Sequence, residues 1–284
     1  MQEAIKKADV LIEALPYIRS FHNKVVVIKY GGSILGEEKI RKGVLEDIVF
    51  MNFMGLKTVL VHGGGPNISD RMRQSGKKTD FVDGMRVTDE QTLNVVEEEL
   101  QKLNAMIVNE ITELGCHAIG LNGKENKLLA SEKKKANIDL GLVGHVTGVN
   151  TKAIFDELDK DKVVVILPMG AGNDGKTYNV NADEAAANVA ESMKAEKLVI
   201  LTNVKGIMRA PDDPSSFMST LTREDARQLM EQKVIQTGMI PKVQACIHAV
   251  TKGVKKTHMV DACIPHALLL EIFTDQGIGT EIIN

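Results

Sequence analysis

Short apolar runs alternate along the chain with longer segments whose apolar residues recur at helical spacing. An uninterrupted apolar run predicts a strand buried on both faces, which is typical of a parallel sheet. The alternation therefore predicts an α/β fold, arranged as a three-layer αβα sandwich. We expect strands at 25–28, 58–62, 162–168, 197–201 and 257–260, and helices at 37–54, 90–114, 185–190, 222–231 and 239–252.

Residues 1–22 precede the first predicted strand and form a predicted helix of their own. Pro16 should kink or end this helix, because proline lacks the N–H that a helix interior needs. Two interpretations remain open: the helix folds back on its own domain, or it forms an arm that docks on a neighbouring subunit. Its apolar stripe consists of Ile5, Ala8, Leu11, Ile12, Leu15 and Ile18.

A glycine-rich turn follows each of the first two predicted strands. Lys29 and Gly31-Gly32 end the first, and His62 with Gly63-Gly64-Gly65 ends the second. Ligands of open α/β sheets bind beyond the carboxyl ends of strands, and glycine-rich turns present backbone N–H groups to oxyanions. We therefore expect both turns to open on one edge of the sheet and to bind an anion beside Lys29. A surface lysine at a frayed strand end is the alternative.

Arg86 follows an Asp-Gly pair that predicts a β-hairpin. Its guanidinium offers a two-pronged donor for a carboxylate or phosphate. The alternative is a surface arginine paired with Asp83 or Asp89, and this segment alone favours that alternative.

Three polar residues, Asn179, Asn181 and Asp183, alternate before a helix of small residues. On an extended segment all three would point to one side, although Asp183 is equally suited to cap the helix. Lys242 lies in the first turn of a later helix, where a cation is disfavoured unless an anion lies beside it.

Composition excludes several classes of function. The 284 residues suffice for one large or two modest domains, and 35 basic against 38 acidic residues give a net charge of −3, so we expect no nucleic-acid partner. No apolar run approaches the length of a membrane span. The acidic N-terminus argues against a targeting peptide, and the three scattered cysteines predict reduced thiols. We expect a soluble, cytoplasmic protein.

Taken together, these segments resemble the amino-acid kinase family over nearly the whole chain. Lys-Tyr-Gly-Gly-Ser at 29–33 and His-Gly-Gly-Gly at 62–65 resemble the wider family, which includes aspartate, carbamate and uridylate kinases. Asp-Gly-Met-Arg-Val-Thr-Asp at 83–89 and Asn-Val-Asn-Ala-Asp at 179–183 resemble its acetylglutamate branch. The resemblance implies an open, mostly parallel central sheet. It also implies an N-terminal oligomerisation helix (1–22), an amino-acid substrate lobe (23–175) and an ATP-binding lobe (176–284).

The resemblance also implies a role for each candidate residue. Lys29 and Lys242 match the lysines that neutralise the transferring phosphoryl group, and Asp183 matches the aspartate that holds both in place. Magnesium would arrive with ATP, so no protein side chains are expected as metal ligands. The substrate would be bound by Gly64, Gly65, Arg86 and Asn179, and ATP by Gly31, Gly32, Asn181 and Lys205.

The implied reaction transfers the γ-phosphoryl group of ATP to the side-chain carboxylate of N-acetyl-L-glutamate. A carboxylate with a pKa of about 4.3 is already ionised at neutral pH, so no general base is needed. We therefore expect His62 to have a structural role, such as fixing the turn through a ring hydrogen bond.

Regulation by arginine is a further implication. Family members with an extra N-terminal helix are arginine-inhibited hexamers, and His258, Glu271 and Gly277 resemble the arginine-site signature. A surface glutamate and a turn glycine are the alternative. Two other functions remain open: a sister kinase of an acetylated aminoadipate or carrier-linked substrate, and a non-catalytic amino-acid sensor. A sensor would have no need of Lys29 and Lys242.

Overall fold

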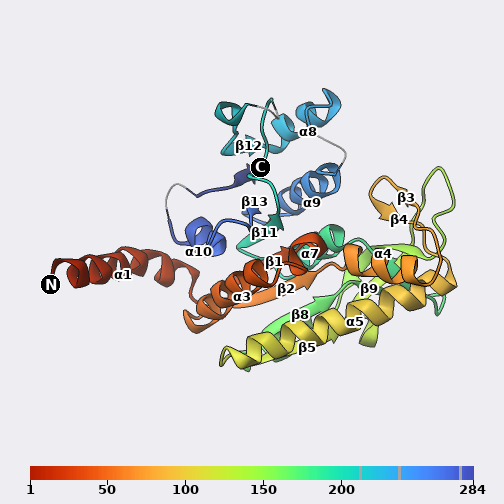
Figure 1. Ribbon diagram of the computed structural model, residues 1–284, viewed down its shortest axis with the longest axis horizontal. Helices are drawn as coiled ribbons and strands as arrows, with labels where there is room; N and C mark the ends of the chain where they lie inside the picture. The colour runs from red at the N-terminus through yellow and green to blue at the C-terminus, as the bar shows by residue number, and fades with distance from the viewer. Residues whose placement is uncertain (211–212, 236–237, 275–276) are drawn as a thin grey trace.

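A twisted eight-stranded sheet runs through the centre of the computed structural model (Figure 1), which describes residues 1–210, 213–235, 238–274 and 277–284. The side chains of residues 3, 4, 6–8, 10 and 11 are outside this description. All neighbouring strands pair in parallel except β13 and β14, which confirms the mostly parallel sheet. In spatial order the strands are β12 (Thr220–Thr222), β14 (Thr280–Ile283), β13 (Lys256–Asp261), β11 (Lys197–Thr202), β1 (Val25–Tyr30), β2 (Lys57–His62), β8 (Val163–Leu167) and β5 (Ala118–Asn122).

Helices cover both faces of this sheet, as the three-layer prediction requires. Successive side chains of a strand point to opposite faces, and β1 shows the result: Val25 and Val27 join one apolar core, whereas Val26 and Ile28 join the other. The first core is covered by α6 (Thr151–Leu158), α7 (Ala182–Ser192), α8 (Arg223–Glu231) and α9 (Ile240–Thr251), and the second by α3 (Glu38–Phe53), α5 (Glu90–Glu113) and α10 (Ala267–Ile272).

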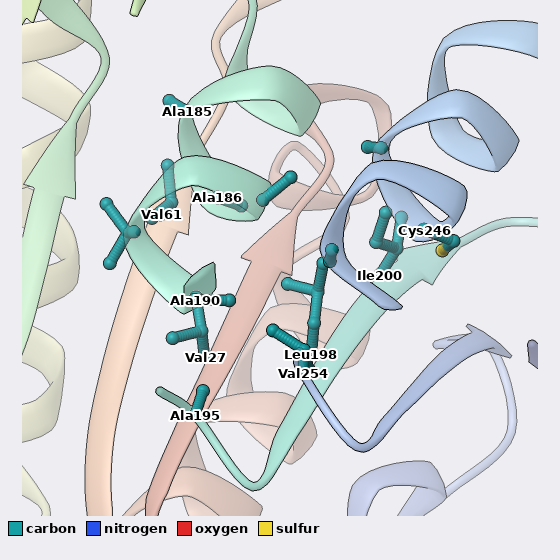
Figure 2. Close-up of a cluster of buried hydrophobic side chains, with 14 of the residues drawn as sticks. Val27, Val61, Ala185, Ala186, Ala190, Ala195, Leu198, Ile200, Cys246 and Val254 are labelled. Carbon is teal, nitrogen blue, oxygen red and sulfur yellow. The ribbon is translucent and has the colours of Figure 1, made fainter. Parts of the chain in front are cut away.

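The face of helix α7 that packs on the sheet consists mainly of alanines. Alanine leaves little side chain between the helix backbone and the strands, so the helix N-terminus lies near the carboxyl ends of β1 and β2. Figure 2 shows this packing, with Ala185, Ala186 and Ala190 of α7 among Val27, Val61, Leu198 and Ile200 of the strands.

Two smaller sheets flank one end of the central sheet. The antiparallel pair β6 (Leu129–Lys133) and β7 (Val143–Val149) closes a small barrel with β9 (Met169–Gly172) and β10 (Thr177–Val180). Asp83 (φ 51°) and Gly84 (φ 76°) form the tight turn of the predicted hairpin. Its strands are β3 (Phe81–Val82) and β4 (Met85–Arg86). The expected lobe boundary at residue 175 lies in the turn between β9 and β10, and the lobe division remains a prediction.

The first helix, α1 (Gln2–Phe21), projects from the body as an arm (Figure 1). Pro16 was expected to kink or end this helix; the helix continues through it and does not end there, whereas the kink stays a prediction. The Ile12 carbonyl four residues earlier lies on an exposed stretch where water can bind it. The helix does not fold back along its length, because Ile5, Ile12 and Leu15 are exposed. The side chains of Ala8 and Leu11 in the same stripe lie outside the described residues.

The C-terminal end of α1 is anchored to the body. Phe21 is buried and meets Phe273 edge to face at 6.4 Å between ring centroids.

Within the described part of the chain, no helix is long and apolar enough to span a membrane. The three cysteines are free thiols, of which Cys116 and Cys246 are buried and Cys263 is exposed. The remaining short elements are α2 (Gly32–Leu35), α4 (Gly65–Gln74), and the 3₁₀ helices Glu125–Lys127 and Pro214–Ser216.

Candidate active site

The two glycine-rich turns meet at the carboxyl ends of β1 and β2, as expected from the parallel pairing of these strands. A Cβ atom placed on Gly32 would lie 2.8 Å from the Gly65 nitrogen and 3.1 Å from the Gly64 nitrogen. Only a residue without a side chain permits this approach. Within the described residues, the amides of Gly32, Gly64 and Gly65 donate to no protein acceptor. Three backbone donors are therefore gathered at one place, where an oxyanion can bind them.

Lys29 and Lys242 converge on a single carboxylate beside these turns. The Lys29 Nζ lies 2.9 Å from Oδ1 of Asp183, and the Lys242 Nζ lies 3.8 Å from Oδ2. Lys29 and Asp183 are both buried, at 6% and 5% exposure. The alternative of a surface lysine at a frayed strand end is thus wrong, because Lys29 lies within a fully buried strand. Asp183 thus contacts two lysines that lie 213 positions apart in the chain. Lys29 belongs to β1, and Lys242 belongs to α9.

The charges in this cluster depend on one another. Burial by itself would raise the pKa of the Asp183 carboxyl, but the two ammonium groups outweigh it and hold the pKa below its usual value. Burial lowers the pKa of Lys242, and the neighbouring Lys29 adds to the effect while Asp183 opposes it. The cluster carries two cations and one anion, so its net charge is positive and it attracts an anionic ligand.

Asp183 is not the helix cap that its position allowed. Asn181 caps α7, because its side-chain oxygen accepts from the amides of Asp183 and Glu184. The extended segment also ends earlier than expected, at Val180, so Asn179, Asn181 and Asp183 do not share one face of a strand. Capping by Asn181 leaves the Asp183 carboxylate free for the lysines.

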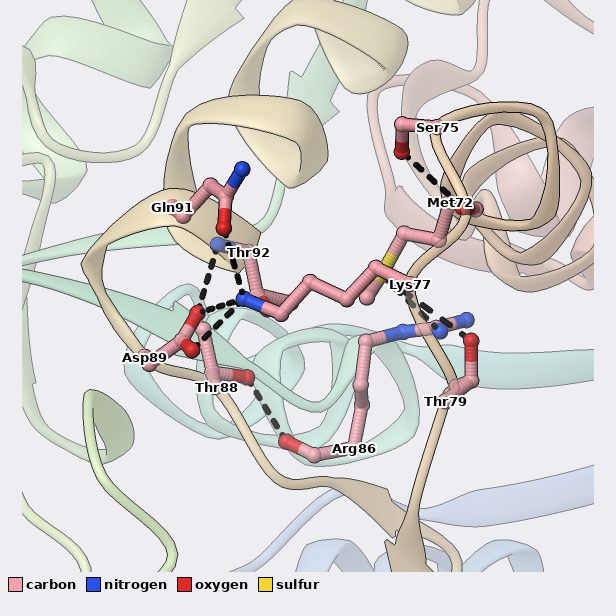
Figure 3. Close-up of polar contacts among 9 residues, drawn as sticks. All are labelled: Met72, Ser75, Lys77, Thr79, Arg86, Thr88, Asp89, Gln91 and Thr92. Atoms are coloured by element: carbon pink, nitrogen blue, oxygen red, sulfur yellow. Dashed lines mark hydrogen bonds and ion pairs between the residues drawn. The ribbon is translucent and has the colours of Figure 1, made fainter.

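Arg86 is buried at 6% exposure, so the surface ion pair favoured by its local sequence is wrong. Asp89 instead caps α5 and pairs with Lys77 at 2.5 Å (Figure 3). The Arg86 guanidinium donates to the Gly65 carbonyl at 3.0 Å and to Ser69 Oγ at 2.9 Å, and it lies over the Phe81 ring. Burial lowers its pKa to about 10, which still leaves it charged at neutral pH.

Thr88 fixes the orientation of the Asn179 amide. The Thr88 hydroxyl donates to the Arg86 carbonyl at 2.6 Å, because a carbonyl can only accept. The same hydroxyl accepts from Asn179 Nδ2 at 3.1 Å. The remaining Asn179 oxygen is thus a free acceptor among the described residues. Thr88 is a site residue that sequence reasoning missed.

Arg86 and Asn179 line one cavity of about 140 Å³, together with Ala182, which precedes Asp183 in the chain. Its lining includes the cationic Arg86 and the amide of Asn179, and also the apolar side chains of Ile68 and Leu100. A small anion with an N–H group and a short apolar portion would match these walls. Gly64, Gly65, Arg86 and Asn179 all contribute to the lining, so the structure brings together the four residues predicted for substrate binding.

Similarity to known proteins agrees with this geometry. The amino acid kinase family matches residues 24–261. The chain is 50% identical over 281 residues to an acetylglutamate kinase of Caldanaerobacter subterraneus subsp. tengcongensis, covering 99% of this chain and 94% of the relative. It is 45% identical to an acetylglutamate kinase of Desulforamulus reducens, covering 100% of both chains. The chain belongs to the amino acid kinase family.

Two solved structures are similar over most of this amino acid kinase. An N-acetylglutamate synthase from Neisseria gonorrhoeae, complexed with coenzyme A and N-acetyl-glutamate, has a TM-score of 0.87 at 27% identity. The match covers 98% of this chain but 63% of the synthase chain. A carbamate kinase from Giardia lamblia bound to AMP-PNP shares the fold, with a TM-score of 0.68 at 16% identity and coverage of 92% and 99%.

Kinases of this family use ATP, and the loop after β11 borders a second, apolar cavity of about 250 Å³. Lys205 lies in this loop with its side chain exposed. Sequence reasoning missed this cavity, because apolar side chains form its walls and nothing in their order along the chain marks them as a binding site. They are Ile207, Met208, Val234, Ile235 and Met239. Gly206 also lines the cavity, with a φ of 131°. In the described residues, no group of three acidic, histidine or cysteine side chains could hold a metal ion. A Mg²⁺ ion here would be held mainly by phosphate oxygens and water.

The kinase has a further cavity of about 380 Å³ between the end of α1 and the C-terminal strands. His258 Nδ1 lies 2.5 Å from Glu271 Oε1, and the amides of Ile278 and Gly279 donate to Oε2. Gly277 (φ 54°) lies against the same carboxylate, where a Cβ would come within 3.0 Å. The structure therefore brings His258, Glu271 and Gly277 together. Both His258 and Glu271 are buried, so the alternative of a surface glutamate is wrong.

Replacing Asp183 tests how strongly the two lysines depend on it. We expect Asp183→Asn to lower the free energy of unfolding by about 3 kcal/mol at pH 7, because Lys29 is left buried without its counter-charge. The pKa of Asp183 is lowered, so its stabilisation is complete above the unfolded-state value of about 3.9 and is lost as pH falls through the folded value. Urea unfolding at pH 7 and pH 3 should show the difference between variant and wild type shrinking at pH 3.

Asp70→Asn is the matched control for this experiment, because Asp70 forms an exposed pair with Arg73. It should change stability by less than about 0.5 kcal/mol. Equal losses in the two variants would contradict the account of the lysine cluster.

Proposed function

We propose that this chain transfers the γ-phosphoryl group of ATP to the side-chain carboxylate of N-acetyl-L-glutamate, giving an acyl phosphate and ADP. The observation that carries the proposal is the pair of lysines on Asp183, beside three glycine amides that donate to no acceptor among the described residues. Relatives named acetylglutamate kinase match the full length of the chain and support the choice of acceptor. The reaction would serve arginine biosynthesis in the cytoplasm.

The difficulty of this reaction is electrostatic, because an anionic carboxylate must approach a polyphosphate. The acceptor is already ionised, so the site needs no base and must instead supply positive charge and alignment. Lys29 and Lys242 supply mobile charge on side chains, and the amides of Gly32, Gly64 and Gly65 supply fixed dipoles. Magnesium bound to ATP would add charge neutralisation on the phosphates.

The acceptor pocket favours an acylated amino acid. Arg86 would bind the α-carboxylate, and the oxygen of Asn179 would accept from the amide N–H that acetylation leaves on the α-nitrogen. A free ammonium would bring a second positive charge next to the buried guanidinium of Arg86 and would be disfavoured there. The adenine ring of ATP would occupy the apolar cavity beside Gly206, with Lys205 at its rim.

Feedback inhibition by arginine is the second part of the proposal. The cavity that holds Glu271 presents a buried carboxylate for a guanidinium, and Lys197 in the same cavity would bind an α-carboxylate. Tyr17 and Phe21 line this cavity from the end of α1, so occupancy can alter the arm. The exposed apolar residues of α1 would pack in a neighbouring subunit of a hexamer built from three dimers.

The substrate assignment is tested by ATP-dependent hydroxamate formation with N-acetylglutamate, glutamate, aspartate, acetylated aminoadipate and carbamate compared. We expect N-acetylglutamate to react with at least a hundredfold higher kcat/KM than glutamate, because glutamate lacks the acyl amide N–H and carries an extra charge. A preference for acetylated aminoadipate would reassign the chain to a sister kinase. No product with any of the five would favour a non-catalytic sensor.

The lysines are tested in the same assay. Lys29→Ala or Lys242→Ala should lower kcat at least a hundredfold, in line with a loss of roughly 3–4 kcal/mol for one preorganised charge-stabilising donor. Lys152→Ala, which removes an exposed lysine paired with Asp156, should retain wild-type turnover. Near-normal turnover in either cluster variant would remove that lysine from the mechanism.

Arg86→Lys should act on binding more than on turnover. The variant keeps the charge but loses the two-pronged donor, so we expect KM for N-acetylglutamate to rise at least tenfold with a smaller change in kcat. Arg73→Lys, an exposed arginine on α4, is the matched control. An unchanged KM would place the substrate elsewhere.

Arginine regulation is tested with Glu271→Gln, which removes the carboxylate charge while keeping the side-chain shape. We expect the concentration for half-inhibition by arginine to rise at least tenfold, with kcat kept within about twofold. Glu191→Gln is the matched control, because Glu191 also pairs with a histidine, His248, at 2.8 Å but lies outside the cavity. Deletion of residues 1–20 should abolish both the hexamer and inhibition; a deletion variant that retains both would refute this part of the proposal.

A further inference from the structure

A buried polar pair behind the glycine turn has no part in the reaction described above. His62 ends β2 and is fully buried, and Asn104 faces it from α5. The Asn104 Nδ2 lies 3.1 Å from His62 Nε2 and 3.1 Å from the Val165 carbonyl. On its other side, His62 Nδ1 lies 3.1 Å from the Gly63 carbonyl. These contacts link α5, β8 and β2 to the turn that lines the active site.

The contacts determine where the imidazole proton lies. The Val165 carbonyl only accepts, so the Asn104 atom near it is the NH₂ nitrogen, which donates to His62 Nε2 as well. Nε2 therefore accepts, and the proton is on Nδ1, which donates to the Gly63 carbonyl. Burial lowers the pKa of His62 to about 4, which is consistent with a neutral ring at neutral pH.

The Gly63 carbonyl matters because of what lies across the same peptide bond. The peptide unit is planar and trans, so the Gly63 C=O and the Gly64 N–H point in opposite directions. A peptide between two glycines has no side chain to hinder its rotation, and flipping it would turn the Gly64 N–H away from the site. The Gly64 nitrogen lies next to Gly32, on the side where the three amides gather. The Gly63 amide is itself held by the Tyr30 carbonyl at 2.9 Å.

We propose that His62 and Asn104 are positioning residues for phosphoryl transfer. The neutral imidazole of His62 holds the Gly63 carbonyl and thereby keeps the Gly64 N–H directed at the transferring group. Asn104 fixes the tautomer that makes this possible, and Gly120 leaves room for Asn104, since a Cβ there would lie 1.9 Å from its oxygen. The inference rests on the proposed kinase function.

Two variants of His62 separate this role from simple filling of the core. The amide nitrogen of asparagine reaches the place of Nδ1 and can still donate to the Gly63 carbonyl, whereas that of glutamine reaches the place of Nε2 and cannot. We expect His62→Asn to keep kcat within about fivefold of wild type. His62→Gln should lower kcat by about a hundredfold, the effect of one lost oxyanion donor, with KM for both substrates within threefold.

Unfolding of both variants is measured alongside, because each removes the ring from a buried position. Loss of kcat in His62→Gln at a stability equal to that of His62→Asn supports the positioning role. Equal kcat losses in the two variants, or losses that follow stability, would overturn it. If wild type itself forms no acyl phosphate, the proposed function fails instead, so the two failures are distinguishable.

The wild-type protein provides a test that needs no variant. Nitrogen-15 NMR of histidine-labelled protein should show one histidine as the Nδ1–H tautomer, neutral down to about pH 5 and assigned to His62 by its absence in His62→Asn. An Nε2–H tautomer, or a protonated ring at pH 7, would overturn the inference.

Discussion

One carboxylate holds two ammonium groups at the centre of this molecule, and much of the surrounding structure serves to place it. Burying Lys29 and Asp183 separately would be costly, whereas together they are stable with Lys242 at their edge. The alanines of α7 bring Asp183 down to the sheet, the buried strand β1 holds Lys29, and the first turn of α9 delivers Lys242. Each of these three features places one charged side chain, so that together they bring the three charges to one point.

Side chains and backbone divide the chemical work. The lysines supply positive charge that can follow a moving phosphoryl group, whereas the glycine amides supply dipoles fixed in direction. Fixed dipoles need support from behind, because glycine backbones rotate freely. His62 and Asn104 give that support from the buried side of the turn, so a neutral pair in the core contributes to a site that depends on charge.

Much of the fold could be predicted from the local sequence. An apolar run such as 25–28 favours a strand buried on both faces, and two such strands in parallel must bring their following glycine turns to one edge. The environment of Arg86 could not be predicted, because its burial depends on Gly65 and Ser69, which contact it from another segment. The same holds for Asn181, whose choice over Asp183 as helix cap depends on lysines that are distant in the sequence. Pro16 does not end α1, because an exposed arm tolerates the loss of one helical hydrogen bond.

The central claim is that Lys29, Lys242 and the glycine amides act on the same phosphoryl group. The most direct measurement is a crystal structure with ADP, Mg²⁺, tetrafluoroaluminate and N-acetylglutamate bound. The account predicts both lysine Nζ atoms and the amides of Gly32 and Gly64 within hydrogen-bond distance of the fluoroaluminate, with Asp183 still between the lysines. A fluoroaluminate bound away from either lysine, or an Asp183 that has released both, would contradict it.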